Sequence, residues 1–210
     1  MNLDPAQFDT TQLVAVAAAL GWASGLRLYA VLFLTGLAGY LGWVPLPPGL
    51  HLLQNPWMLG ASGFMLFIEF FADKIPGLDT LWDGVHTLLR IPAGAALAAA
   101  VFGVDQGSWA AGAALLGGAL AATSHVAKAT TRAAVNTSPE PLSNLALSLA
   151  GDAAVPGMLW LSWAHPVAAL IALVVAVLTM LVTTFLLLKF LRGLWARLRS
   201  GVGYGRNSPA

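Results

Sequence analysis

The sequence predicts an all-α fold, a polytopic transmembrane helix bundle of about six spans with a broken or re-entrant segment. Only 9% of the 210 residues are charged and 58% are hydrophobic, and the mean hydropathy is +0.77. A soluble domain carries about 25% charged residues, so this composition cannot cover a water-exposed surface. Apolar stretches of roughly 20 residues, the length that crosses a bilayer as a helix, recur along the chain. They leave no room for a separate soluble domain.

The first apolar stretch, residues 11–41, is longer than one span requires. It has Ser24 and Arg27 in its middle, so it is either one long tilted helix or a helix broken near Ser24. Because it runs into Arg27 and not into a small-residue cleavage site, we expect it to be retained and not removed as a signal peptide. Residues 42–55 hold three prolines and are flanked by tryptophans, which predicts a loop at the membrane interface.

The middle of the chain holds three further apolar stretches. Residues 56–71 form the second predicted span. Residues 91–104 are apolar but only about 21 Å long as a helix. They are either re-entrant or the end of a helix that begins in the amphipathic stretch 81–90. Residues 106–125, which are rich in alanine, glycine and leucine, predict another span.

The last two predicted spans form an antiparallel hairpin. Residues 141–163 are apolar but interrupted by Asp152 and Pro156, and a two-residue linker joins them to residues 166–188. Residues 166–188 carry no charge and are long enough to cross a hydrocarbon core of about 30 Å. They are the clearest span in the sequence.

We predict that residues 1–192 form a single transmembrane domain and that residues 193–210 form a basic cytoplasmic tail. Half of the ten lysines and arginines follow the last span. Cytoplasmic flanks of membrane helices are enriched in these residues, which favours this topology over nucleic-acid binding. An even number of spans puts the N-terminus in the cytoplasm as well, and a broken first helix reverses it. The basic residues after the last span are Lys189, Arg192, Arg197, Arg199 and Arg206.

Most other charged residues lie inside or beside apolar stretches. A charge at the bilayer centre costs about 2.5–3.5 kcal/mol on insertion scales, so intramembrane ionisable residues are candidates for function. Pro76 and Gly77 also predict irregular backbone beside the carboxylates, as in ion and substrate sites. The candidate binding or pathway residues are Arg27, Glu69, Asp73, Lys74, Asp79, Asp83, His86, Arg90, His125, Lys128, Arg132, Asn136 and Asp152.

Helical spacing arranges eight of these residues in two rows. Residues spaced by three and four positions share one face of a helix. The first row is predominantly acidic and the second is basic, so we predict that the rows face one another, or a shared cavity, inside the bundle. The first row is Asp79, Asp83, His86 and Arg90, and the second is His125, Lys128, Arg132 and Asn136.

Other interpretations of these charges remain open. The rows could be a buried ion-pair network that only fixes helix register, or a charged helix lying flat on the membrane. Asp83 and His86 have the spacing of a carboxylate–histidine metal motif, but four basic residues compete for the carboxylates, and we expect neither a metal nor another cofactor. The absence of cysteine excludes thiolate sites. The common hydrolase, zinc-protease and phosphate-loop motifs are also absent, which argues against an enzyme.

Three blocks of the sequence resemble an uncharacterised bacterial membrane family catalogued as domain of unknown function 4126. The first is GLR at 25–27 with Tyr29. The second is EFFADKIPGLDTLWD at 69–83, followed by His86 and Arg90. The third runs from His125 through NTSPEP at 136–141. The resemblance extends to about residue 188 and implies a multi-pass protein of the bacterial inner membrane, but no activity.

The arrangement favours a transporter or permease that moves a small polar or ionic solute through a charged intramembrane cavity. Carboxylates would accept protons or cationic groups, and Lys128 and Arg132 would hold anionic groups. The mixed signs argue against a simple cation channel, which favours acidic rings. A membrane scaffold with a structural ion-pair network and a membrane-embedded lipid-modifying enzyme are the alternatives. The expected partners are the lipid bilayer and the solute, without nucleic acid.

Overall fold

The computed structural model describes residues 8–75, 77–103, 106–137 and 141–203. Within these residues the chain is entirely helical apart from turns and connections, so the predicted all-α fold is confirmed. Pro76, residues 138–140 and Arg206 lie outside the described residues. The elements are α1 (Thr10–Tyr40), the 3₁₀ helix η2 (Pro48–Gln54), α2 (Pro56–Ala72), α3 (Leu78–Phe102), α4 (Gly107–Val135), α5 (Pro141–Ala164) and α6 (Pro166–Gly203).

Five helices, α1, α3, α4, α5 and α6, are long and apolar enough to cross a membrane. The sixth, α2, is apolar but has 17 residues, which is the lower limit for a span. The prediction of about six membrane segments is therefore confirmed, with α2 as the short one.

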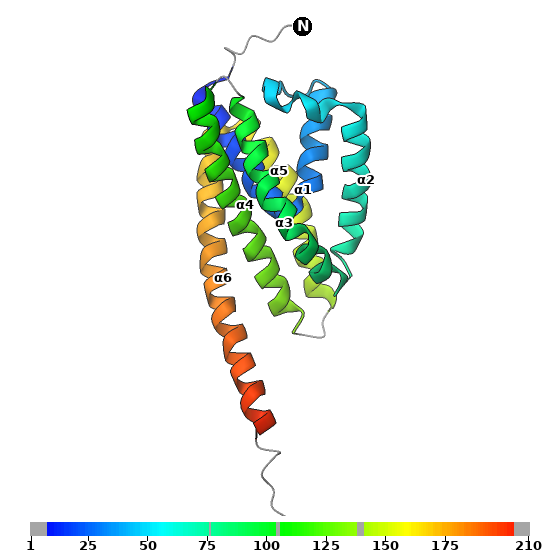
Figure 1. Ribbon diagram of the computed structural model, residues 1–210, viewed down its shortest axis with the longest axis vertical. Helices are drawn as coiled ribbons and strands as arrows, with labels where there is room; N and C mark the ends of the chain where they lie inside the picture. Colours follow the sequence, from blue (N-terminus) through cyan, green and yellow to red (C-terminus); the bar gives the residue numbers. More distant parts are fainter. Residues whose placement is uncertain (1–7, 76, 104–105, 138–140, 204–210) are drawn as a thin grey trace, which may run out of the picture.

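Helix α1 is broken and folds back on itself. Arg27 has non-helical backbone angles (φ −148°, ψ 87°) in the middle of α1, and the two arms, residues 10–26 and 28–40, run in opposite directions (Figure 1). The start of the first arm and the loop after the second arm both contact Trp163, as expected if the chain folds back. Gln12 Nε2 lies 3.5 Å from Trp163 O, and Trp163 Nε1 donates to Pro45 O at 3.3 Å. The first arm is as long as α2, whereas the second arm, roughly 20 Å long, is too short to cross a hydrocarbon core of about 30 Å alone.

The break leaves the carbonyl of Leu26 without its donor from the next helical turn, and side chains of α4 donate to this carbonyl and to that of Trp22. Lys128 Nζ donates to Leu26 O at 3.0 Å, and Ser124 Oγ donates to Trp22 O at 2.7 Å. Irregular backbone at membrane depth is tolerated only where protein or water satisfies it. The buried tip of α1 therefore depends on α4.

The remaining helices alternate in direction from α2 to α6 (Figure 1). Residues 91–104 are not re-entrant, because α3 is one helix from Leu78 to Phe102 with Pro92 inside it. The span predicted over residues 141–163 is confirmed, because α5 runs through Pro156 to Ala164. Prolines are tolerated in membrane helices where neighbouring groups satisfy the freed backbone. The described part of the chain begins and ends at opposite ends of the bundle, as a broken first helix requires.

Glycines bring the first arm of α1 into close contact with α3 and α4. A Cβ on Gly21 would lie 2.5 Å from Gly117 Cα, and a Cβ on Gly117 would lie 2.7 Å from Gly94 O. Small residues allow this approach, which provides the van der Waals contact that holds helices together in lipid. Most of the first arm is buried, so α1 is the central element of the bundle and its tip lies in the interior.

Candidate functional site

The two charged rows face each other across α3 and α4, which run antiparallel (Figure 1). Polar side chains of the two helices pair along this interface. Asn136 Nδ2 donates to Thr80 Oγ1 at 3.2 Å, and Lys128 Nζ lies 3.0 Å from Asp83 Oδ1. Arg132 reaches both Asp79 (3.4 Å) and Asp83 (3.7 Å). The predicted juxtaposition of the rows is therefore present. Asn136 lies at its exposed end.

The start of α3 is organised by Asp79 itself. Gly77 has φ +89°, a conformation that glycine adopts without steric cost. Asp79 Oδ1 accepts hydrogen bonds from Gly77 N at 2.8 Å and from Thr80 N at 2.6 Å. The carboxylate thereby satisfies backbone donors at the helix start, where negative charge is favourable. Its other oxygen is left to face Arg132.

Arg90 bridges two carboxylates from different helices. Its Nη2 donates to Glu69 Oε1 of α2 at 2.8 Å, and its Nη1 donates to Asp83 Oδ1 at 2.6 Å. Arg90 and Glu69 are fully buried, and Asp83 is nearly so. This triad joins the end of α2 to the charged face of α3.

Asp73, which follows the last residue of α2, lies among three cations. Its carboxylate oxygens are 3.0 Å from Arg27 Nη2, 3.2 Å from Lys128 Nζ and 3.2 Å from Arg132 Nη1. The Asp73 side chain is completely buried. The tip of α1, the end of α2 and the basic face of α4 therefore meet at one carboxylate.

Helix α5 contributes Asp152 and Ser148. Asp152 lies 2.9 Å from Arg27 Nη2 and 3.0 Å from Lys74 Nζ, and Ser148 Oγ accepts from Arg27 Nη2 at 3.0 Å. The Lys74 ammonium also lies 3.1 Å from the centre of the Phe70 ring. These contacts connect α2 and α5 through the tip of α1.

The ion pairs form one connected network that is balanced in charge among the described residues. Every member is within 4.0 Å of an oppositely charged partner. Because an unpaired buried charge costs several kcal/mol, roughly, balance is what allows this number of charges in the interior. The five cations are Arg27, Lys74, Arg90, Lys128 and Arg132, and the five anions are Glu69, Asp73, Asp79, Asp83 and Asp152.

The two candidate histidines border the network without belonging to its ion pairs. His86 Nδ1 lies 2.8 Å from Trp82 O and its Nε2 lies 3.1 Å from Tyr29 Oη, with the ring stacked on Trp82. His125 Nε2 lies 2.8 Å from Thr87 Oγ1. Both rings thus have hydrogen-bond partners in the bundle. Within the described ranges, no cluster of three or more histidine or acidic side chains is arranged to hold a metal ion.

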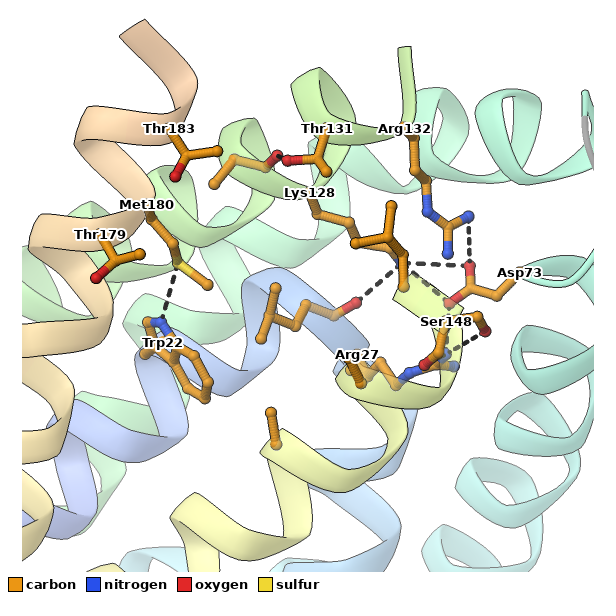
Figure 2. Close-up of a pocket in the computed structure, with 16 residues that line it drawn as sticks. Trp22, Arg27, Asp73, Lys128, Thr131, Arg132, Ser148, Thr179, Met180 and Thr183 are labelled. Atoms are coloured by element: carbon orange, nitrogen blue, oxygen red, sulfur yellow. Dashed lines mark hydrogen bonds and ion pairs between the residues drawn. The ribbon is translucent and has the colours of Figure 1, made fainter. Parts of the chain in front are cut away.

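One cavity adjoins the network, and a second lies nearer the open ends of the arms of α1. The tip cavity, of about 330 Å³, lies between the tip of α1 and helices α4, α5 and α6 and is lined by Arg27, Asp73, Lys128 and Arg132 together with apolar residues. In Figure 2 these charged side chains gather on one side, and Trp22 and Met180 lie on the other. The arm cavity, of about 600 Å³, lies between the arms of α1 and α5 and is lined by Thr35 and by aromatic residues such as Trp43, Trp160 and Trp163.

Some residues of the site were not anticipated as candidates. Ser148 lies one helical turn before Asp152 in the sequence, and this i, i+4 spacing on α5 was the available signal. Thr87 and Tyr29 are uncharged, and only their contacts with His125 and His86 identify them. The predicted candidates, in contrast, are all charged or strongly polar.

The helices and the ion pairs define a multi-pass membrane protein with a buried network of charged side chains. The chain matches the family model described as Domain of unknown function (DUF4126) over residues 14–185 and belongs to that family, as its three sequence blocks indicated. No curated protein and no solved structure matches the chain.

Proposed function

We propose that the protein is a transporter or permease that moves a small polar or ionic solute past the tip of α1. The observation that carries the proposal is the meeting of ten ionisable side chains at the buried tip of a broken helix. Broken helices and intramembrane charges occur together where transporters bind solutes and ions. The mixed signs disfavour a simple cation channel.

The positions of the two cavities support this proposal. They adjoin consecutive stretches of α5, residues 147–154 for the tip cavity and residues 156–164 for the arm cavity. Arg27 and Asp152 pair beside the first of these stretches. A solute crossing the protein would enter one cavity, displace the ion pairs at the tip, and leave through the other.

The orientation is part of the proposal. In it the chain lies in the plasma or bacterial inner membrane with its C-terminus in the cytoplasm, because half of its basic residues follow the last span and cytoplasmic flanks are enriched in lysine and arginine. The arm cavity then faces the opposite side, where the arms of α1 begin and end.

Cysteine accessibility tests the two-sided path without knowledge of the solute. The natural chain has no cysteine, so single cysteines report without background. We expect Thr131→Cys in the tip cavity and Ala38→Cys in the arm cavity to react with a membrane-impermeant maleimide, each from a different side of oriented vesicles. Water in the cavities would allow the thiol to ionise, which its reaction requires.

Val175→Cys on α6 is the matched control, because Val175 is exposed on the bundle surface within the candidate span of highest mean hydropathy. Lipid should keep it unreactive from both sides. Reaction of the two cavity cysteines from one side only, or of neither, would contradict the proposed path.

Charge replacement separates transport from folding. We expect Asp73→Asn to reduce solute uptake into proteoliposomes by about tenfold or more, because Asp73 holds three cations in place and charged groups in low dielectric interact strongly. Radiolabelled acetate, phosphate, glutamate and rubidium, offered one at a time, would identify a transported class. Unfolding of the same variant in detergent measures the loss of stability independently.

A structural role is the second candidate, and the charge balance of the network favours it. If Asp73→Asn lowers only stability, and the double variant Asp73→Asn/Lys128→Met regains full stability and all activity, the charges are structural and the transport proposal fails. A lipid-modifying enzyme would instead change the lipid products of cells that lack the protein.

A further inference from the structure

The tip cavity has a charge imbalance that the network as a whole does not have. Of the ten charged side chains, only Arg27, Asp73, Lys128 and Arg132 line the cavity. They carry three positive charges and one negative charge. The other four carboxylates of the network do not line the cavity, so the charged part of its wall is predominantly positive.

Two of the lining cations have donor nitrogens that make no hydrogen bond among the described residues. Arg27 and Arg132 are both more than nine-tenths buried. Arg27 Nη1 makes no hydrogen bond. Arg132 Nη1 makes none either, and its contacts with Asp73 Oδ1 at 3.2 Å and Asp79 Oδ2 at 3.4 Å are ion pairs. A guanidinium has only donors and pairs best with carboxylate or phosphate oxygens. Buried donors without acceptors are rare, and an anion in the cavity would satisfy them.

The rest of the cavity is mostly apolar, with hydroxyl groups contributed by Thr131, Ser148, Thr179 and Thr183. Trp22, Leu26, Leu147 and Met180 line it, and Trp22 and Met180 lie across from the charged side in Figure 2. The outer face of α6, beyond Met180, is exposed along most of its length. A fully hydrated inorganic ion would leave this wall unused, whereas burying hydrocarbon against it is favourable.

We propose that the tip cavity binds an anionic amphiphile, a phosphate monoester or carboxylate that carries a single hydrocarbon chain. The head group accepts from Arg27 and Arg132 beside Lys128, and the chain lies against Trp22 and Met180. The volume of about 330 Å³ is at the low end of the range for ligand pockets, which suits one chain. The inference rests on the proposed function, since it names the class of solute that is moved.

Binding to the full-length protein in phosphatidylcholine nanodiscs tests the site. Radiolabelled decyl phosphate should bind above the level of empty nanodiscs. Inorganic phosphate, which lacks the chain, should bind at least about tenfold more weakly because it cannot use the apolar wall. Decyltrimethylammonium, with the same chain and the opposite charge, should not bind above empty nanodiscs. Equal binding of the two phosphates, or binding of the cation, would overturn the inference.

Two glycines of α5 provide a matched pair of variants. Gly151 lines the cavity, and a Cβ there meets only Arg27 Nε at an ordinary 3.6 Å, whereas a Cβ on Gly157 has open space. Gly151→Leu places its side chain at the cavity wall and should weaken decyl phosphate binding by about tenfold or more, while Gly157→Leu should bind as the natural protein does. Unchanged binding by Gly151→Leu, with unfolding in detergent confirming a folded variant, would place the ligand elsewhere and refute the site.

Two further measurements identify the source of the anion and distinguish the amphiphile proposal from the transporter proposal. If added phosphatidylglycerol displaces decyl phosphate, the anion is a lipid head group; if it does not, the occupant is a soluble single-chain anion. Binding of decyl phosphate without flux of any solute supports the site and contradicts the transporter. If a different solute is transported and decyl phosphate does not bind, the amphiphile proposal fails and the transporter proposal stands.

Discussion

Replacing Arg90 with methionine is expected to lower the free energy of unfolding by about 3–5 kcal/mol, the cost of removing one partner of a buried ion pair. Arg90 is fully buried and donates to Glu69 at 2.8 Å and to Asp83 at 2.6 Å. Methionine fills much of the same volume but leaves the Glu69 carboxylate without its cation in the interior. Heat or denaturant unfolding in detergent, followed by tryptophan fluorescence, measures the change.

The matched control for Arg90→Met is Arg192→Met on the exposed surface of α6, which should change stability by no more than about 0.5 kcal/mol. The double variant Arg90→Met/Glu69→Gln removes the orphaned charge together with the arginine and should regain part of the loss. An Arg90→Met protein as stable as the natural one would mean that the triad contributes nothing to folding.

The second large effect is expected at Gly117, where α1, α3 and α4 meet. An alanine Cβ there would contact Ala98 Cβ and would lie 2.7 Å from Gly94 O. Because one of these atoms is backbone, α3 must shift, and overpacking of this kind costs about 1–3 kcal/mol. Gly117→Ala should unfold at lower denaturant concentration than the natural protein in the same detergent.

Gly112→Ala on the same helix is the control, because a Cβ at Gly112 has nothing within 4 Å. Alanine favours helix over glycine by about 0.5–1 kcal/mol, so this variant should be unchanged or slightly more stable. The opposite signs at two glycines of α4 would identify packing as the cause. Equal effects at both positions would mean that the close contact at Gly117 has no energetic weight.

The facing of α3 and α4 was predictable from residue spacing together with the cost of isolated charges in a membrane. The helical period determines that Asp79 and Asp83 share a face, as do Lys128 and Arg132, and the cost of isolated intramembrane charges requires that such faces meet. The structure brings Arg132 within 3.4 Å of Asp79 and Lys128 within 3.0 Å of Asp83. Local periodicity and a global energetic rule were both needed.

The fold of α1 was only half predictable. The length of its apolar stretch suggested a break, and Ser24 marked the region, but the irregular residue is Arg27. No proline is present there, and Gly25 is helical. The break is stabilised by Lys128, which donates to Leu26 O from 102 positions along the chain, and residue spacing within α1 carries no information about that contact.

The prolines within the membrane helices do not interrupt them. Pro156 lies inside the span predicted over residues 141–163, which α5 forms as one helix, and Pro92 lies within a continuous α3. Local rules for helix breakers describe a chain in water, whereas neighbouring helices in a bundle can satisfy the backbone groups that proline frees. For residues 91–104, which could have been re-entrant, sequence alone therefore could not choose between the two alternatives.

The charge balance of the network has a consequence for energetics across the membrane. Five cations already match five carboxylates, so an anion that takes the place of Asp73 among its three cations adds one negative charge to the interior. A proton that enters with the anion and neutralises the displaced carboxylate restores the balance. Anion and proton would then cross as an uncharged unit, and the membrane voltage, which does about 2.3 kcal/mol of work per charge for each 100 mV, would do none on it.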